Sequence, residues 1–395
     1  MEPVRDVNIS HNNLPSFPRI PNPEDVIILN LSLNRIPFLP GAQIKKFKNL
    51  QVLDLESNML ETLPPEIGYL SNLKELFLND NHLVTLPSQI GTLGNLEILS
   101  LDINNLSSRG LPYEIGNLRN LRLLSLNDND LTLSGIPRTI AFLNNLKSLF
   151  LERNLLQDIP LEISLLKNLE HLSLEDNDLT SFPPQLAHLR NLKVLNLSLN
   201  SFPTLPLEIG EFSNLTDLQI AGNELSFIPW GIGELKNLRL LDLSANSLIS
   251  LDFPPLLREL VHLETLDLSI NQITLLPPWI GELTKLKRLL LFENQLKSLP
   301  PEIGNLKLLE ELILGRNQLA DLPPEICQLT QLRIFELQEN EISSLPGCLD
   351  QLTEIRKFDI RNNPIQILPF DIEYLSGYAQ YTQLPKWSFA RSVLF

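Results

Sequence analysis

Residues that could carry out chemistry are few in this chain and lie far apart in the sequence. The five histidines show no spacing typical of metal ligands; they are His11, His82, His171, His188 and His262. The sequence contains no phosphate-binding glycine loop of the forms G-x-x-x-x-G-K-[ST] or G-x-G-x-x-G, no H-E-x-x-H and no C-x-x-C. These observations predict neither a catalytic site nor a cofactor or metal site.

The charge and composition of the chain indicate which kinds of molecule it can bind. The chain of 395 residues carries a net charge of −16 at pH 7, and 43% of its residues are hydrophobic. The apolar content is enough to fold the chain, because burial offsets the ordering entropy. A negative field disfavours the phosphates of nucleic acids and anionic lipid surfaces. We therefore expect no nucleic-acid partner.

Localisation is predicted from targeting signals and cysteines. No apolar run approaches the ~18 residues that a membrane-spanning helix needs. The first thirteen residues, MEPVRDVNISHNN, lack the basic and apolar regions of a secretion signal. The two cysteines, Cys327 and Cys348, are too few for the paired clusters that close many secreted repeat domains. We expect no membrane insertion and a cytoplasmic location, and export by a signal-less route stays open.

The elements that must position any functional side chain form a regular repeat. The pattern L-x-x-L-x-L-x-x-N-x-L, followed by L-P-x-x-I-x-x-L, recurs along nearly the whole chain. Most copies are 23 residues long, and those that open at Asn104, Asn129 and Asn246 have two extra residues before the proline. The repeated asparagines are Asn12, Asn34, Asn58, Asn81, Asn104, Asn129, Asn154, Asn177, Asn200, Asn223, Asn246, Asn271, Asn294, Asn317, Asn340 and Asn363.

The physical chemistry of one repeat explains its residue types. In the segment from Leu73 to Asn81, alternation along a short strand sends Leu76 and Leu78 inward and leaves the intervening residues facing out. A buried Asn81 can satisfy backbone groups where the strand turns, so stacked copies predict an asparagine ladder. Pro87 then fixes φ at the start of a turn or short helix on the far side.

The repeat resembles the leucine-rich repeat family in its 23-residue form, with the L-P-x-x-I-G-x-L signature at Leu63–Leu70. Similar repeats occur in bacterial proteins and in intracellular proteins of the Ras-suppressor and Scribble type. The resemblance implies an α/β solenoid, a curved horseshoe of about 16 repeats. Its parallel sheet would line the concave face, and short helical or 3-10 turns would line the convex face.

Domain organisation follows from where the pattern stops. The match runs from about Val4 to Leu375, which predicts a solenoid over residues 1–375. Aromatic residues crowd into the last stretch, so residues 376–395 are predicted to form a C-terminal aromatic cap. No cap precedes the first repeat. The edge strand of the first repeat either stays unpaired or pairs with another chain. A second copy of this protein is one possible partner for that edge.

Two local patterns suggest chemistry, and their positions in the repeat argue against it. Cys348-Leu349-Asp350 matches the C-x-D triplet of bacterial ubiquitin ligases that carry leucine-rich repeats, but those enzymes place it in a separate helical domain after the repeats.

The strings Asn127–Asp130 and Glu175–Asp178 resemble calcium ligands. Their repeats are roughly two strand spacings, ~10 Å, apart, whereas calcium needs six to eight oxygens at 2.3–2.6 Å. We predict that the protein is not an enzyme.

Acidic residues dominate the outward positions of the third to eighth repeats. Eleven of them stand there against a single cation, Arg153; they are Asp54, Glu56, Glu75, Asp80, Asp102, Asp128, Asp130, Glu152, Glu175, Asp176 and Asp178. Such a surface either attracts a basic partner or merely keeps the protein soluble. For the first case, Glu152, Glu175, Asp176 and the outward-facing Phe150 are the candidate binding residues.

A second candidate surface lies in the thirteenth and fourteenth repeats. Leu290, Phe292 and Ile313 occupy outward positions on adjacent strands, and Arg288 and Arg316 stand beside them. An apolar centre with a charged rim is typical of a protein-binding hot spot. The C-terminal segment folding back over this face, or scattered tolerated apolar residues, are the alternatives. On the convex side, Trp230 and Trp279 could form another surface or pack over the turns.

The sequence therefore predicts a non-enzymatic module that binds a protein partner on its concave face. A basic surface on that partner is one option. Two alternatives remain. The protein could be a regulatory scaffold of a signalling enzyme assembly, as in the Ras-suppressor type. It could also be an exported bacterial effector or adhesin that binds a host protein. A fold alone does not decide among these functions.

Overall fold

The computed structural model describes residues 5–249 and 254–366. Sixteen three-residue strands follow one another in the sheet in chain order. They are β1 (Asp6–Asn8), β2 (Ile28–Asn30), β3 (Val52–Asp54), β4 (Glu75–Phe77), β5 (Ile98–Ser100), β6 (Leu123–Ser125), β7 (Ser148–Phe150), β8 (His171–Ser173), β9 (Val194–Asn196), β10 (Asp217–Gln219), β11 (Leu240–Asp242), β12 (Thr265–Asp267), β13 (Arg288–Leu290), β14 (Glu311–Ile313), β15 (Ile334–Glu336) and β16 (Lys357–Asp359).

One short α-helix and a series of 3-10 turns connect the strands. They are η1 (Pro23–Asp25), α1 (Gly41–Ile44), η2 (Pro65–Tyr69), η3 (Ser88–Thr92), η4 (Tyr113–Asn117), η5 (Leu133–Gly135), η6 (Arg138–Phe142), η7 (Leu161–Leu165), η8 (Pro184–His188), η9 (Leu207–Glu211), η10 (Trp230–Glu234), η12 (Pro255–Glu259), η13 (Pro278–Glu282), η14 (Pro301–Asn305), η15 (Pro324–Gln328) and η16 (Leu349–Gln351).

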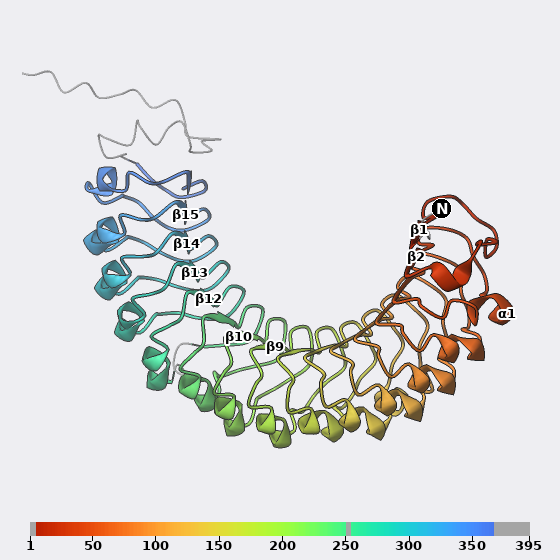
Figure 1. Cartoon of the computed structure of the whole chain (residues 1–395). Coiled ribbons are helices and arrows are strands. Elements are labelled where there is room, and N and C mark those ends of the chain that lie inside the picture. Colours follow the sequence, from red (N-terminus) through yellow and green to blue (C-terminus); the bar gives the residue numbers. More distant parts are fainter. Residues whose placement is uncertain (1–4, 250–253, 367–395) are drawn as a thin grey trace, which may run out of the picture. The chain divides into compact units, whose positions relative to one another are not determined.

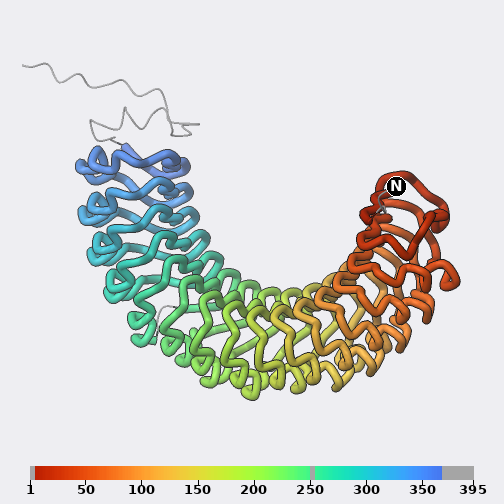
Figure 2. Tube along the Cα trace, viewed as in Figure 1, coloured from red at the N-terminus to blue at the C-terminus, as the bar shows by residue number. Residues whose placement is uncertain are grey.

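The chain divides into two compact units. Unit 1 comprises Met1–Glu224 and Pro229–Leu235, and unit 2 comprises Leu225–Ile228 and Lys236–Phe395. The described part of each unit is by itself a curved stack, with strands on its concave side and turns on its convex side (Figures 1 and 2). Unit 1 contains β1 to β10 and unit 2 contains β11 to β16. The predicted repeat solenoid with about 16 repeats is confirmed.

The core consists of leucine and isoleucine rows stacked in register. Neighbouring strands pair in parallel, so that Leu53 lies opposite Leu76 and Leu76 opposite Leu99. These residues are fully buried, as are Ile67 and Leu70, which reach the core from the convex side. Three-residue strands are too short to be stable alone, so the burial of these rows between adjacent repeats holds the stack together.

The repeated asparagines bond each repeat to its neighbours. The side-chain nitrogen of Asn81 donates to the carbonyl oxygens of Leu55 at 3.0 Å and Leu78 at 3.1 Å. Its oxygen accepts from the backbone N–H of Leu60 at 2.9 Å. Equivalent bonds recur from Asn34 to Asn363. The amide thus satisfies backbone groups that the turn would otherwise leave unpaired in the interior.

The residue before each of these asparagines has a left-handed backbone conformation. Its φ lies between 49° and 62° in every repeat from His11 to Asn362. Only Gly222 occupies this position without the steric cost that a Cβ imposes there. The position even holds the β-branched Ile103 and Ile270. The hydrogen bonds of the adjacent asparagine hold this conformation, and the repeats with a residue other than glycine at this position store local strain.

Cys327 and Cys348 form a disulfide with a Cα–Cα distance of 5.9 Å, which joins η15 to the residue that precedes η16. Two cysteines are too few for paired clusters at the ends of the repeats, but they are enough for this one bridge between consecutive repeats. Disulfides persist in oxidising compartments. The bridge therefore weighs against the predicted cytoplasmic location, which stays a prediction.

Some predictions fall on residues that the structure does not describe. The aromatic cap at 376–395 and the end of the solenoid at 367–375 lie outside the described residues. Within residues 5–249 and 254–366, no helix combines the length and the hydrophobicity needed to cross a membrane.

Candidate functional site

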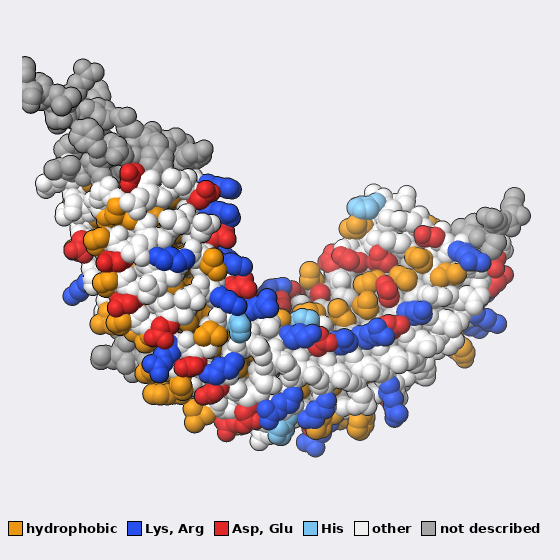
Figure 3. All heavy atoms as spheres, turned by 60° about the vertical axis from the view of Figure 1, so that its left-hand side comes forward, with side chains coloured by type: hydrophobic (Ala, Val, Ile, Leu, Met, Phe, Trp, Pro, Cys, Tyr) orange, Lys and Arg blue, Asp and Glu red, His pale blue; other side chains and the backbone are white. Residues whose placement is uncertain are grey.

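Two rows of opposite charge run across the strands of unit 1. The strand-start row consists of the residues that stand seven positions before each asparagine of the buried ladder. The strand-end row consists of the two residues that directly precede each of these asparagines. The strand-start row contains Lys74, Glu97, Arg122, Lys147, Glu170 and Lys193, and the acidic members of the strand-end row are Glu56, Asp80, Asp102, Asp128, Glu152, Glu175 and Asp176. Figure 3 shows an acidic cluster and, apart from it, a strip rich in Lys and Arg on the right-hand arm.

Carboxylates of the strand-end row are held by the backbone and hydroxyls of the next repeat. Asp102 accepts hydrogen bonds from the hydroxyl of Ser125 at 2.6 Å and from the backbone N–H of Asn127 at 2.7 Å. The single cation of this stretch, Arg153, forms two hydrogen bonds with Asp128 at 2.5 and 2.6 Å. Among the described residues, no other carboxylate of this row forms an ion pair, although Arg153 also attracts Glu152 and Glu175 at longer range.

Burial and mutual repulsion raise the pKa of carboxyls of the strand-end row and of Asp54, which precedes Glu56 by two residues. Loss of solvation is the main cause of the raised pKa of Asp54 and of Asp102. The pKa of Glu56 is raised first by burial and then by the charge of Asp54. A cation from a binding partner would relieve this unfavourable ionisation.

The structure brings the candidate residues of unit 1 together on β7 and β8. Phe150 is half-buried and lies in register between Ser125 and Ser173. Glu152 is half-buried directly after β7, and Glu175 follows β8 and accepts a hydrogen bond from Asn196 at 2.7 Å. Asp176 is exposed beside the ladder. Phe150 at the end of β7 and Glu152 directly after it therefore belong to the same repeat, and their role in binding stays a prediction.

The candidate residues of unit 2 also form one cluster. Leu290 and Ile313 lie opposite each other on β13 and β14, and Phe292 follows β13. The guanidinium carbon of Arg316 is 5.3 Å from the ring centroid of Phe292. All three apolar side chains are half-buried, so part of each is accessible.

A charged rim surrounds this cluster. Arg288 pairs with Glu311 at 2.7 Å, and Arg316 pairs with Glu293 and with Glu339, both at 3.1 Å. These pairs fix the guanidinium groups beside the apolar centre. Large apolar side chains on an outward strand face gain little from the packing of the repeat itself, so burial by another molecule would stabilise them further.

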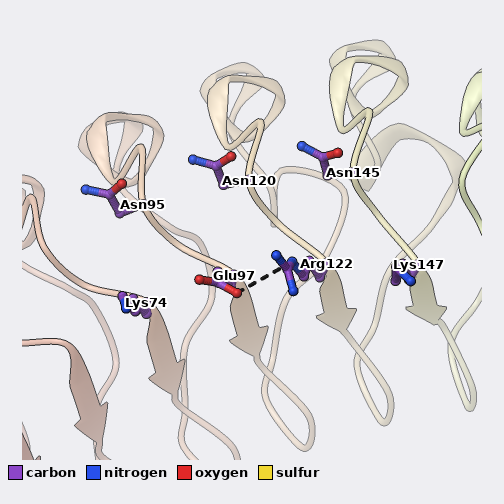
Figure 4. A pocket seen from close by; sticks show the side chains of 7 residues that line it. All are labelled: Lys74, Asn95, Glu97, Asn120, Arg122, Asn145 and Lys147. Carbon is purple, nitrogen blue, oxygen red and sulfur yellow. Dashed lines mark ion pairs between the residues drawn. The ribbon is translucent and has the colours of Figure 1, made fainter.

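The structure also contains a site that the sequence analysis missed. A hollow of roughly 560 Å³ opens along the strand-start row of unit 1. Lys74, Glu97, Arg122 and Lys147 line it from the strand starts, and Asn95, Asn120 and Asn145 line it from the preceding segments (Figure 4). A second hollow of roughly 440 Å³ continues past Lys147 to Glu170 and Lys193.

The asparagines of these hollows form a second, exposed ladder, nine residues before the buried one. Asn95 donates to the carbonyl of Ser71 at 2.8 Å, Asn120 to that of Gly94 at 2.7 Å, and Asn145 to that of Arg119 at 2.8 Å. The Asn-Leu dipeptide that recurs in front of most strands is the sequence signal that could have revealed this ladder.

Ion pairs link the alternating charges of the strand-start row. Glu97 lies 3.5 Å from Arg122, and Glu170 lies between Lys147 at 2.7 Å and Lys193 at 2.6 Å. Hydrogen bonds from the two lysines lower the pKa of Glu170 to about 2. Among the described residues, Lys74 has no ion-pair partner.

The suspected calcium ligands serve the fold. Asn129 belongs to the buried ladder, Asp128 pairs with Arg153, and Asn127 accepts the backbone N–H of Glu152 at 2.8 Å. In the described part of the chain, no group of three or more His, Cys, Asp or Glu residues has the arrangement of a metal site.

Four other residues have positions that bear on the sequence interpretation. Cys348 is bonded to Cys327, so it carries no free thiol in this structure. Trp230 is 55% exposed on the convex side of unit 1, whereas Trp279 of unit 2 is half-buried. The outward Asn196 is buried, and its side-chain oxygen accepts the backbone N–H of Ser198 at 3.0 Å.

Family models for leucine-rich repeats match several parts of the sequence. A leucine-rich repeat region model matches residues 28–129, and a leucine rich repeat model matches residues 213–273 and 307–365. A further leucine rich repeat model matches residues 168–189. No match was found among the curated proteins that were searched.

Many solved structures resemble this chain. A leucine-rich repeat protein of Leptospira interrogans is 39% identical with a TM-score of 0.89, and the match covers 95% of this chain and 94% of that one. The plant peptide hormone receptor RGFR1, solved in complex with RGF2, is 31% identical with a TM-score of 0.67 over 86% of this chain and 59% of the receptor chain. An internalin from Listeria monocytogenes, 20% identical with a TM-score of 0.58 over 92% of this chain and 88% of that one, shares the fold.

Proposed function

Because the chain belongs to the leucine-rich repeat family, we propose that it is a module that binds a protein partner on its concave strand face, without catalysis of its own. The observation that carries the proposal is the cluster of Leu290, Phe292 and Ile313 inside a rim of paired charges. Accessible apolar groups fixed by such a rim have the composition of an interaction hot spot. The related receptor RGFR1, solved with a bound hormone, supports this reading by similarity.

The strand-end row of unit 1 offers a second contact of different chemistry. Its carboxylates are partly desolvated and repel one another, so a basic surface on the partner would gain from pairing with them. Glu152, Glu175 and Asp176, with Phe150 beside them, form the part of this row in which charge and an aromatic ring adjoin. Electrostatic attraction there would mainly accelerate association.

Affinity capture from the native source, followed by mass spectrometry, tests the proposal. The bait is the whole chain, and the variant Phe292→Ala probes the hot spot. We expect this variant to lose about 2 kcal/mol of binding energy, roughly thirtyfold in affinity, because its ring lies on an accessible face. Its stability should change by less than about 1 kcal/mol, because truncation at the surface opens no internal cavity.

A matched control distinguishes this site from general surface effects. Phe142 is 56% exposed on the convex side of unit 1, so Phe142→Ala removes the same ring from a different face. Equal affinity of both variants for a captured partner would exclude the Leu290–Phe292–Ile313 cluster as its binding site. A large loss of stability in Phe292→Ala would show that the ring is part of the packing.

The biological setting separates the two alternative roles. Capture of components of a signalling enzyme assembly would favour a regulatory scaffold, and appearance of the protein in culture supernatant would favour an exported effector or adhesin. Alkylation of free thiols in freshly isolated protein gives independent information on location. Blocked Cys327 and Cys348 would favour an oxidising compartment, and two alkylated thiols would favour the cytoplasm.

A further inference from the structure

We propose that the hollow along the strand-start row of unit 1 binds an acidic segment of a protein partner, whose carboxylates pair with Lys74, Arg122 and Lys147. This inference deepens the proposed function, because it names the chemistry of one partner segment and the place where it docks. It concerns a part of the strand face that is separate from the strand-end carboxylates.

The charge of the hollow is the first support. Three cations and one carboxylate line it, and that carboxylate, Glu97, is already 3.5 Å from Arg122. Arg122 is paired with Glu97, and Lys147 is paired with Glu170 at 2.7 Å. Their side chains are nevertheless 63% and 57% exposed, so both can also reach a ligand. In a protein with a net charge of −16, this local excess of positive charge is unusual. Carboxylates are favoured ligands of such clusters, because their hydrogen bonds with Lys and Arg are charge-assisted.

The asparagine side of the hollow is the second support. The side-chain nitrogens of Asn95, Asn120 and Asn145 each donate one hydrogen bond to a backbone carbonyl of the preceding repeat. An amide nitrogen carries two hydrogens, so each retains one donor after this bond. Figure 4 shows the three asparagines in a row on one side of the hollow and the strand-start residues in a second row on the other side. Amide donors and exposed cations that line the same hollow can bind carboxylates or backbone carbonyls of an extended peptide.

The distance between the two rows lets them act independently. Five residues of extended chain separate a strand-start residue from the strand-end residue of its own repeat, which is roughly 16 Å at ~3.3 Å per residue. The Debye length at physiological ionic strength is about 8 Å. The acidic row therefore does not cancel the attraction of the basic row for a carboxylate.

The same arrangement disfavours a polyphosphate ligand. A nucleic acid broad enough to cover both rows would bring phosphates against the strand-end carboxylates. A peptide can instead carry carboxylates on the side that faces the strand starts and cations on the side that faces the strand ends. The opposed rows thus also fix the direction across the strands in which such a segment would lie.

Isothermal titration of the whole chain with synthetic octaglutamate at low salt tests the proposal. We expect binding that weakens as salt rises from ~50 to ~300 mM, because the contact is electrostatic. The triple variant Lys74→Glu, Arg122→Glu and Lys147→Glu should weaken it by about tenfold or more. The control variant Lys45→Glu, Lys46→Glu and Arg109→Glu makes the same charge change at exposed positions outside the hollow, and should stay within about twofold of wild type.

Carbodiimide coupling identifies the contact directly. The reagent activates a glutamate carboxylate of the peptide, and a lysine amine then displaces the activated group to form an amide while the reagent leaves as a urea. Mass spectrometry should find octaglutamate on Lys74, which has no ion-pair partner among the described residues. Coupling of Lys147 to Glu170 within the protein, 2.7 Å apart, is the internal positive control.

Several results would overturn the proposal. Absence of octaglutamate binding to the wild type, or equal weakening by both triple variants, would do so. Binding of inorganic polyphosphate or heparin without binding of octaglutamate would assign the hollow to polyanions instead. This test uses a synthetic peptide and variants of the strand-start row. Its failure would therefore not count against the proposed function, which is tested separately with captured partners and Phe292→Ala.

Discussion

The side-chain oxygen of Asn200 accepts a hydrogen bond from the backbone N–H of Leu179 at 3.0 Å, which ties one repeat to the one before it. The amide nitrogen of Asn200 also donates to the carbonyls of Leu174, Leu197 and Ser198 at 2.9 to 3.1 Å. The two amide hydrogens are shared among these three carbonyls, and that of Ser198 also accepts the backbone N–H of Asp176. One buried side chain therefore pairs with backbone groups of its own repeat and of the repeat before it. The preference for asparagine at this position follows, because no apolar residue offers both a donor and an acceptor.

Replacing Asn200 by Leu should lower the free energy of unfolding by about 1–3 kcal/mol, because buried backbone groups lose their partners. The matched control is Asn105→Leu, since Asn105 is exposed and its change should stay within about 0.5 kcal/mol. Urea denaturation measures both. Equal midpoints would show that the ladder adds nothing to stability. Asn196 is unsuitable as a surface control, because it is buried and hydrogen-bonded.

The residues with left-handed backbone that precede the ladder asparagines give a prediction of increased stability on mutation. Ile103 has φ of 54° and its side chain is 53% exposed, so it pays the steric cost of this conformation without burying much surface. Ile103→Gly should raise the free energy of unfolding by up to about 1 kcal/mol, because glycine adopts positive φ without a Cβ clash. Thermal and urea unfolding measure the change.

Val84→Gly is the control for this prediction. Val84 has similar exposure, 52%, but lies outside the residues with positive φ. Glycine there should reduce stability by roughly 0.5–1 kcal/mol through the entropy of the unfolded chain. Stabilisation by neither variant, or destabilisation of equal size by both, would mean that the left-handed residues are not strained.

The repeat pattern predicts the parts of the fold that burial dictates. The inward rows of Leu and Ile and the turn-forming prolines repeat without interruption, so the strand of each repeat and its inward residues could be located from the sequence. Leu290 and Ile313 could likewise be placed side by side, because strands in register bring equivalent positions together. Alternation is enough to identify a face when each strand has only one buried side.

The strand-start hollow could not be found in this way, for a physical reason. Lys74 and Arg122 precede the three strand residues to which the alternation applies, and Asn95 lies in the segment before them. Their relation depends on how the chain turns from the convex side into the strand. The disulfide between Cys327 and Cys348 escaped for a similar reason, since it joins irregular segments of two repeats.

The pKa of Asp102 predicts a pH-dependent effect on stability. Burial raises its pKa in the folded state, so the folded protein binds this proton more tightly than the unfolded chain does. The ionised carboxylate therefore destabilises the fold above that pKa, and the penalty disappears as the pH falls through it. Asp102→Asn should be more stable than wild type at pH 7, by no more than about 1 kcal/mol, because the site is partly exposed.

Urea titrations between pH 7 and pH 3 measure this difference. An asparagine oxygen can still accept the bonds from Ser125 and Asn127, so the variant removes the charge and keeps the geometry. The advantage of Asp102→Asn should shrink towards acid pH. Asp130→Asn, at an exposed carboxylate of the same stretch, controls for the general loss of negative charge. A constant advantage across the pH range, or the same advantage in the control, would contradict the assignment to burial.

Reversal of charge in the strand-end row predicts a kinetic effect. If a basic partner approaches this row, the triple change of Glu152, Glu175 and Asp176 to Lys should slow association and flatten its salt dependence. Dissociation should change little, because charges at an accessible rim act mainly on the encounter. Stopped-flow or surface-based kinetics with a captured partner, between ~50 and ~300 mM salt, measure both rates.

The matched control reverses Glu61, Glu224 and Glu341, three exposed carboxylates outside the strand-end row. Wild-type association rates that do not respond to salt would show that the row only keeps the protein soluble, and equal slowing by both triple variants would reveal a general effect of net charge.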